Sequence, residues 1–293
     1  ALVAATAVFG FNPLTVSLSG TVLSDIPYLC GTLLVVWAAR RHWNEGIKRW
    51  ALIGALTGFC CLLRPTGAAL LGAVCVALVL EGRWKEGVCA GLSGAAVVAP
   101  FLARNYFYAG QPLIYGVELA NPYAGARGLS VLAASLYNSA GYYSRELFSR
   151  TLFRWPGNFL VLELGTQALC LGAIVAGLRQ WGLSGWKKLL PIYLGIYLLV
   201  HGIWSKQSGR YLLPALPFFA LFLFLGPSNI SRRFGASLVR IMLAVSLLLS
   251  LGPVFHIVEA SLWPSTEVNT PPARTYAWIR DNTSPRDIFA AEL

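Results

Sequence analysis

The chain has 293 residues, of which 56% are hydrophobic and 12% are charged, and its mean hydropathy is +0.62. Because soluble domains carry about 25% charged residues, this composition excludes an ordinary soluble domain and predicts a multi-pass membrane protein. The formal net charge is +11, which in a membrane protein indicates lysine and arginine held in cytoplasmic loops. No basic cluster interleaved with aromatic residues lies in a soluble segment, so we expect no nucleic-acid binding.

Apolar stretches recur along the chain and predict an all-α fold, a transmembrane helix bundle with about nine membrane segments. The first stretch ends before Pro13, and the second begins near Pro27, where the start of a helix tolerates proline. Ser24 or Asp25 can cap that helix. The expected membrane segments are residues 1–9, 27–39, 50–63, 68–80, 88–103, 158–178, 189–204, 211–225 and 241–258.

The sequence Arg64-Pro65-Thr66-Gly67 interrupts an apolar region between two short stretches. The first of them, residues 50–63, covers about 20 Å as a helix, less than the hydrocarbon thickness of about 30 Å. The region is therefore either two short spans or a re-entrant hairpin, and such a break is tolerated only where protein or a wet cavity surrounds it. Arg64 is costly there unless it is paired or used.

Residues 104–157 form the longest segment that we place outside the membrane. Within this segment, apolar and small side chains recur at helical spacing and predict one helix face. The residues of this face are Leu136, Ala140, Tyr143, Leu147 and Thr151. Two interpretations fit equally: a helix that lies in the interface plane, forming an external interfacial loop, or an ordinary packed surface helix.

Lysine and arginine are dense in the short loops at residues 40–49, 81–87, 179–188 and 227–240, so we place these loops in the cytoplasm. The segments on the opposite side are then residues 10–25, 64–67, 104–157, 205–210 and 259–293. The polar region 259–293 predicts the start of a soluble external domain after a membrane core at residues 1–258. We expect the chain to be an internal piece of a longer protein.

Polar side chains collect at helix ends on the external side. The most informative stretch for function runs from Lys206 to Phe219, because it holds two cations and a tyrosine between apolar runs. An arginine stays charged and its planar fork matches phosphate oxygens, although such cations also anchor helices at the interface. His201, one turn inside, can bind a ligand or bridge helices. The candidate substrate-binding residues are Arg64, Arg104, Tyr106, His201, Lys206, Arg210 and Tyr211.

Asp25 is the acidic residue at the immediate mouth of a span, and it is the candidate catalytic residue. A carboxylate among fixed cations can take a proton, bind a sugar hydroxyl or hold a divalent metal, and a simple helix cap explains it equally well. We name no metal ligands and no certain cofactor. Neither a glycine-rich phosphate loop nor a Ser/His/Asp set, HExxH or CxxC motif is present.

Several stretches resemble the membrane glycosyltransferases of the GT-C superfamily, most of all the branch with bacterial aminoarabinose transferases of lipid A and protein O-mannosyltransferases. The stretches are Ser24-Asp25-Ile26-Pro27, Leu62-Leu63-Arg64-Pro65-Thr66-Gly67, Pro100 to Tyr106 with Gly110-Gln111-Pro112, Ser208-Gly209-Arg210-Tyr211-Leu212-Leu213-Pro214, and Tyr276 to Thr283. Each motif is weak alone, and the resemblance rests on their order and sidedness.

The resemblance implies a polyprenyl-phosphate-linked sugar donor, a lipid, glycan or protein acceptor, and an inverting transfer on the periplasmic face of a bacterial inner membrane. It also implies that Arg210 and Arg64 contact the donor phosphate, that Asp25 lines the pocket, and that the main catalytic base precedes Ala1. Two rival functions remain. One is a transporter or flippase of a lipid-linked saccharide, and the other is a polysaccharide polymerase or ligase.

Overall fold

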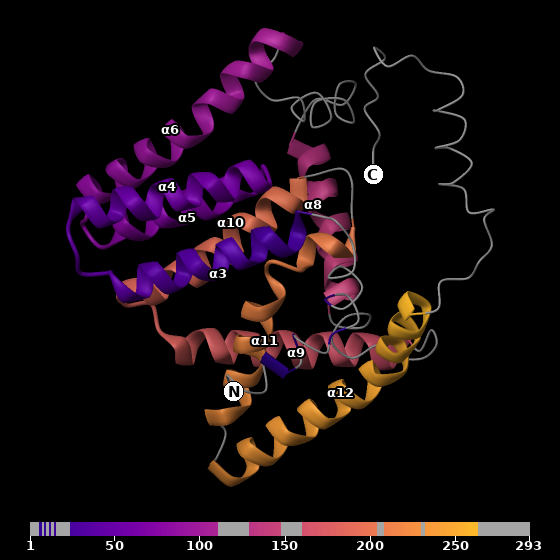
Figure 1. Ribbon diagram of the computed structural model, residues 1–293. Helices are drawn as coiled ribbons and strands as arrows, with labels where there is room; N and C mark the ends of the chain where they lie inside the picture. Colours follow the sequence, from indigo (N-terminus) through magenta and orange to yellow (C-terminus); the bar gives the residue numbers. More distant parts are fainter. Residues whose placement is uncertain are drawn as a thin grey trace, which may run out of the picture.

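The computed structural model describes residues 6–7, 9, 12, 15, 24–110, 129–147, 160–203, 208–229 and 232–262. Every regular element within these ranges is a helix (Figure 1), which confirms the all-α class. The α-helices are α3 (Asp25–Arg41), α4 (Ile47–Leu63), α5 (Gly67–Leu80), α6 (Trp84–Ala109), α8 (Leu129–Ser144), α9 (Leu160–Trp181), α10 (Leu189–Ile203), α11 (Leu216–Leu225) and α12 (Arg232–Leu262). Three short 3-10 helices join them: η3 (Gly185–Lys188), η4 (Gly209–Leu212) and η5 (Gly226–Asn229).

Five helices, α3, α4, α5, α9 and α10, lie within three residues of the predicted apolar stretches at each end. The predicted break between α4 and α5 is also confirmed, with Arg64 in extended backbone after α4. Gly67 begins α5, and a Cβ at this position would lie 2.6 Å from the Cys60 carbonyl carbon. The tight return of the chain therefore depends on the missing side chain.

Three predicted boundaries are wrong. Helix α6 continues through Pro100 to Ala109 and ends on Gly110 in the left-handed conformation, so the Arg104–Tyr106 stretch is helical rather than an exit loop. Helix α11 is shorter than the predicted 211–225 stretch because Pro214 and Pro217 restrict where a helix can begin. Helix α12 starts at Arg232 and runs to Leu262, past the predicted domain boundary at residue 258. The rest of the predicted C-terminal domain lies outside the described residues.

The helices differ in whether they can cross a bilayer by length and composition. Of the described helices, one stretch, Trp84–Tyr108, is long and apolar enough. The stretches Gly67–Leu80, Leu216–Leu225 and Val239–Phe255 are apolar but shorter. The predicted set of nine spans is therefore not confirmed, since breaks such as the one at Arg64 divide the apolar sequence into pieces below the length of about 20 residues that a span needs.

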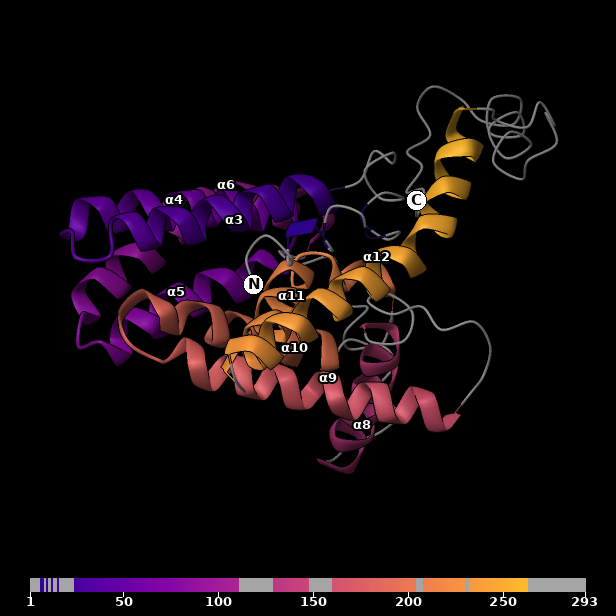
Figure 2. The same ribbon diagram turned by 90° about the horizontal axis from the view of Figure 1, so that it is seen from below.

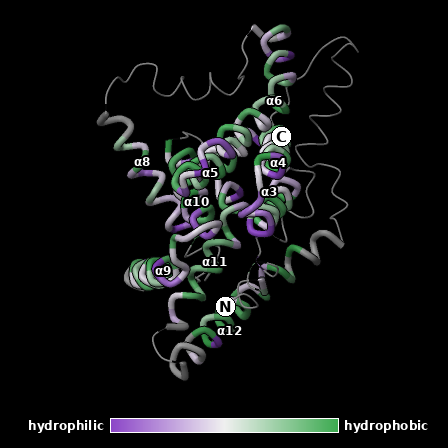
Figure 3. Tube along the Cα trace, turned by 90° about the vertical axis from the view of Figure 1, so that its left-hand side faces the viewer, coloured by the Kyte–Doolittle hydropathy of each residue, from purple (hydrophilic) through white to green (hydrophobic). Residues whose placement is uncertain are grey.

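One hydrophobic core runs from α3 to α12, and its largest fully buried side chains include Trp50, Tyr193, Tyr197 and Phe222. Helices α3 to α6 pack on one another in sequence, α10 packs on α5, and α11 packs on α9 (Figures 1 and 2). Seen end-on in Figure 3, α9 and α12 lie at the outside of this group and carry hydrophobic residues. The site described below lies at one end of this core.

Helix α8 lies across the end of the bundle, nearly perpendicular to α9 and α10 (Figures 1 and 2). Its buried row is Ser139, Tyr143 and Leu147, whereas the predicted face had Ala140, which is exposed. Of the predicted face, Tyr143 and Leu147 are buried, Leu136 is half-buried, Ala140 is exposed, and Thr151 lies outside the described residues. The face is rotated because α8 closely approaches α10, where Ser135 Oγ donates to the Gly202 carbonyl at 3.2 Å and small side chains fit.

Glycines allow two pairs of helices to approach closely. A Cβ at Gly54 of α4 would lie 2.2 Å from the Ala90 carbonyl oxygen of α6, and one at Gly58 would lie 2.5 Å from the Gly94 carbonyl oxygen. On α9 the small residues Ala173 and Gly177 are also four apart. A Cβ at Gly177 would lie 2.0 Å from the Phe222 carbonyl oxygen, and one at Gly226 would lie 2.0 Å from the Ala173 carbonyl oxygen. Small residues four apart are typical of close helix contacts in membranes.

Three of the four loops predicted to be cytoplasmic, those at residues 40–49, 81–87 and 179–188, meet at one end of the bundle, on the left in Figure 1. Arg83 donates to the carbonyl oxygens of Trp43 and Glu45, which joins the α5–α6 turn to the α3–α4 loop. Glu81 pairs with Lys188 at 2.5 Å and accepts a hydrogen bond from the Gly185 amide at 3.0 Å. Three separate basic loops therefore form one structural unit, and the Asp25 end of α3 lies at the opposite end.

We expect Gly54→Ala to lower the free energy of unfolding by about 1–3 kcal/mol, because the added methyl group meets backbone and the two helices must separate. Thermal unfolding of the detergent-solubilised protein measures this effect. The control is Gly172→Ala on α9, where nothing lies within 4 Å of a Cβ. Equal melting temperatures for the two variants would contradict the close contact.

We expect acid to loosen the loop at η3. The bond from Lys188, together with the Gly185 amide, holds the pKa of the Glu81 carboxyl below its usual value. A lowered pKa in the folded state contributes stability above the unfolded pKa of about 4.3, and this stability is lost as the pH falls through the folded value. The protection of the Gly185 amide against hydrogen exchange should therefore fall between pH 6 and pH 3. In Glu81→Gln the protection should be low at both pH values, and unchanged protection in that variant would refute the contact.

Candidate functional site

The site is built on a buried ion pair between α3 and the break that follows α4. Asp25 lies in the first turn of α3 and is 2% exposed, and Arg64 follows the last residue of α4 and is 8% exposed. Arg64 Nη1 donates to Asp25 Oδ1. The predicted need for a partner at Arg64 is thus met, because a buried guanidinium without a carboxylate would carry a large desolvation penalty.

A second cation reaches the same place from η4. The guanidinium carbons of Arg64 and Arg210 lie 5.3 Å and 5.4 Å from the centre of the Tyr211 ring. Both arginines are attracted to the ring by its quadrupole, and Arg210 and Tyr211 are half-buried. Asp25 pairs with Arg64, so Arg210 is the second guanidinium of this group.

His201 lies beside Tyr211 in an aromatic enclosure. The two rings are stacked with their centres 5.0 Å apart, and the rings of Tyr197 and Tyr143 stand edge-on at 4.4 Å and 6.3 Å. His201 is 3% exposed, and neither ring nitrogen has a hydrogen-bond partner among the residues that the structure describes. Buried polar atoms are normally satisfied, so the imidazole is available to a polar group of a ligand or to water.

Three tyrosines that the sequence analysis did not select make hydrogen bonds around two stretches of irregular backbone, the break after α4 and η4. The Tyr28 hydroxyl donates to the Thr66 carbonyl oxygen and pairs with the Tyr193 hydroxyl, at 3.3 Å each. The Tyr197 hydroxyl donates to the Tyr211 carbonyl oxygen at 2.7 Å. A signal was present in the sequence, since Tyr193, Tyr197 and His201 recur every four residues and share one face of α10.

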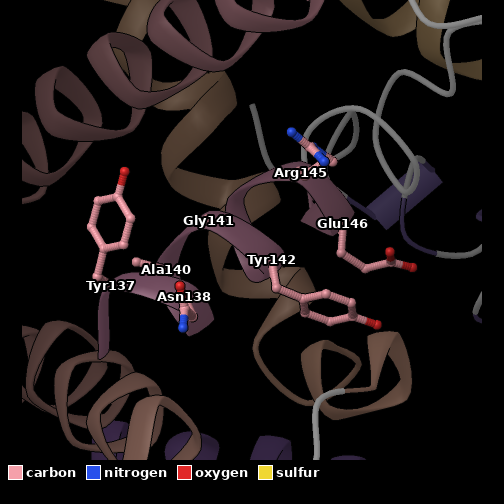
Figure 4. A pocket seen from close by; sticks show the side chains of 7 residues that line it. All are labelled: Tyr137, Asn138, Ala140, Gly141, Tyr142, Arg145 and Glu146. Atoms are coloured by element: carbon pink, nitrogen blue, oxygen red, sulfur yellow. The ribbon is translucent and has the colours of Figure 1, made fainter. Parts of the chain in front are cut away.

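A hollow of about 490 Å³ lies along the outer face of α8 and the turn after it (Figure 4). Its lining combines two tyrosines with amide, guanidinium and carboxylate groups: Tyr137, Asn138, Ala140, Gly141, Tyr142, Arg145 and Glu146. A Cβ at Gly209 would lie 2.5 Å from Glu146 Oε1. Glu146 therefore lies against η4 at the residue before Arg210. The sequence analysis selected neither the hollow nor Glu146.

The structure brings together Asp25, Arg64, His201, Arg210 and Tyr211, which are five of the eight predicted site residues. Arg104 and Tyr106 lie at exposed positions near the end of α6, and no interaction found among the described residues joins them to this group. Lys206 lies outside the described residues. Asp25 binds Arg64 rather than capping α3 with its side chain.

No protein-family model, curated protein or solved structure matches the chain. In the part of the chain that the structure describes, no group of three His, Cys, Asp or Glu side chains is placed to hold a metal ion. The function is therefore argued from the geometry of the site.

We expect Asp25→Asn to destabilise the protein by about 3–5 kcal/mol, because it leaves the Arg64 guanidinium buried without a counter-charge. The melting temperature in detergent measures this loss. The double variant Asp25→Asn/Arg64→Met removes both charges and should recover most of the stability. The control is Glu45→Gln, which breaks an exposed pair and should change little. A double variant no more stable than Asp25→Asn would contradict this account.

Proposed function

We propose that the chain is the membrane core of a glycosyltransferase, which moves a sugar from a polyprenyl-phosphate donor to a lipid, glycan or protein acceptor at the external face. One observation carries the proposal: two guanidiniums, one held by a buried carboxylate, converge on Tyr211 at the end of the bundle opposite the basic loops. Fixed cations at this depth are costly, which favours a function for them.

Exposed apolar side chains support a membrane location with several spans, up to the nine segments predicted. Leu92 and Phe107 of α6, Leu169 of α9 and Phe255 of α12 are between 67% and 82% exposed. Such side chains on several helix surfaces are unfavourable in water and suit contact with lipid. The glycine contacts between helices and the clustering of basic loops at one end are further features of membrane bundles. On this proposal the basic end faces the cytoplasm of a bacterial inner membrane.

Arg64 and Arg210 have complementary properties for binding a phosphate. Arg64 is fixed by Asp25 and by burial, so it keeps one orientation whether or not a ligand is present. Arg210 is half-buried and can present its fork to phosphate oxygens. Placing the phosphate at the end of the bundle leaves the polyprenyl chain free to lie along the lipid-facing helices.

The chemistry that follows is an inverting displacement. A base removes the proton of an acceptor hydroxyl, the oxygen attacks the anomeric carbon, and the bond to the phosphate oxygen breaks. The polyprenyl phosphate leaves with the electron pair, and the added negative charge is stabilised by the two arginines. In the described structure Asp25 is held by Arg64, so we assign Asp25 to positioning that arginine.

We expect Arg210→Ala to reduce sugar transfer at least 100-fold, because one of the two cations at the leaving phosphate is lost. Transfer from a panel of polyprenyl-phosphate-linked hexoses and pentoses into lipid and glycan fractions measures this in proteoliposomes. Arg210→Lys should retain more activity than Arg210→Ala, yet less than the wild type, since lysine keeps the charge without the fork.

The matched control is Arg41→Ala, an exposed arginine at the basic end of α3, which should leave transfer unchanged. Full transfer by Arg210→Ala would remove the site assignment. A transporter would instead move the lipid-linked saccharide across the bilayer without forming a glycosidic bond, so the appearance or absence of a new bond separates the two functions.

A further inference from the structure

We propose that the basic end of the bundle binds an anionic phospholipid at a defined site. The site residues are two cations and three tryptophans: Trp37, Arg40, Trp181, Trp186 and Lys187. The inference rests on the membrane location within the proposed function, and it does not depend on sugar transfer. Two observations carry it: each cation lies on a tryptophan ring, and an exposed apolar row leads away from one of the cations.

Trp181 of α9 and Trp186 of η3 form the base of the site. Their rings stand edge to face with the centres 5.3 Å apart. Trp181 is also fixed from two other directions, because its Nε1 donates to the Lys187 carbonyl oxygen at 3.0 Å and its ring stands edge-on to Phe222 at 5.9 Å. Tryptophan is enriched at membrane–water interfaces because its ring is apolar and its N–H is polar. In the proposed orientation the pair is therefore a rigid aromatic surface at the depth of the lipid headgroups.

A cation lies over each of these rings. The Arg40 guanidinium carbon is 5.4 Å from the centre of the Trp186 ring, and Lys187 Nζ is 5.7 Å from the centre of the Trp181 ring. Arg40 comes from the last turn of α3 and Lys187 from η3, so two separate elements present positive charge to one aromatic pair. A ring attracts a cation without cancelling its charge, so both charges remain available to an anion.

The carboxylates at this end of the bundle are engaged with other cations. Their pairs are Glu45–Arg49, Glu81–Lys188 and Glu86–Arg83. In the part of the chain that the structure describes, no carboxylate pairs with Arg40 or Lys187. A lipid phosphodiester matches these two charges, because its oxygens accept hydrogen bonds from a guanidinium fork and from an ammonium group.

An exposed apolar row on α3 leads from Arg40 toward the middle of that helix. Leu33, Trp37 and Arg40 are four and three residues apart, so they share one face of α3. Leu33 is 39% exposed and Trp37 is 59% exposed. In the proposed orientation this row starts in the hydrocarbon region and ends at the cytoplasmic surface. The occupant that meets the row and the cations together has apolar chains and an anionic head, which is the chemistry of an anionic phospholipid.

The test titrates the purified full chain in detergent with phosphatidylglycerol and, separately, with phosphatidylcholine, and native mass spectrometry counts the bound lipids. We expect phosphatidylglycerol to bind more tightly by about tenfold or more. In Arg40→Gln/Lys187→Gln its affinity should fall about 25-fold, because each cation near an anionic headgroup contributes about fivefold. Trp37→Ala should lower the affinity about threefold or more, because it removes a surface for the acyl chains. Glycerol phosphate, which has the charge without the chains, should not displace the lipid.

The matched control is Lys48→Gln, which removes one exposed charge from the same end of the bundle and should leave the affinity unchanged. Because Arg40 is exposed, Arg40→Gln alone should keep the wild-type melting temperature and lose about fivefold in affinity. This single variant decides the question if the double variant does not fold.

Equal affinity for the two lipids would overturn the inference. So would a loss in Lys48→Gln as large as that in Arg40→Gln, because charge spread over the whole end would then explain the binding. Displacement by glycerol phosphate would identify a soluble anion as the ligand and overturn it as well. Sugar transfer without lipid selectivity would refute this site alone, and lipid selectivity without sugar transfer would refute the transferase and retain the site. If the wild type binds neither lipid, the proposed membrane location fails and the site fails with it.

Discussion

The buried ion pair between Asp25 and Arg64 is the interaction on which this end of the molecule depends. It joins the first turn of α3 to the break between α4 and α5, two places that are 39 residues apart in sequence. Neither charge is stable there alone, because a buried charge without its partner carries a large penalty. The pair also fixes the guanidinium beside Tyr211, so the same interaction that closes the fold orients a cation in the candidate site.

Around the ion pair, tyrosine hydroxyls form hydrogen bonds with backbone groups that would otherwise bind water. The hydroxyls of Tyr28 and Tyr197 bind the Thr66 and Tyr211 carbonyl oxygens, which are backbone groups at two breaks in helical structure. Irregular backbone inside an apolar bundle needs such partners. Tyrosine suits the role because its ring packs in the core while its hydroxyl reaches a polar atom. The site is therefore rigid on its inner side, and α8 lies across its end.

The two ends of the bundle have different chemistry. At one end, basic loops are joined by contacts such as Arg83 to Trp43 and Glu81 to Lys188. At the other, two arginines lie at the Tyr211 ring, and beside them is the imidazole of His201, which has no hydrogen-bond partner in the described part of the chain. The first arrangement ties basic loops to one another, whereas the second gathers two guanidiniums and aromatic rings around Tyr211. This contrast supports a function at the Arg210 end.

The sequence by itself determined the all-helical class, the break at Arg64, the limits of five helices and five residues of the candidate site. These features follow from hydrophobic periodicity, proline and buried charge, which act locally along the chain. It did not determine the continuation of α6 past Pro100, the face of α8, or the contacts of Tyr28 and Glu146. Those depend on which helices meet: Ser139 faces inward because α8 crosses α10, and Glu146 lies beside Gly209 because η4 folds under α8. Only the tertiary structure decided them, since contacts between distant residues leave no periodic signal in the chain.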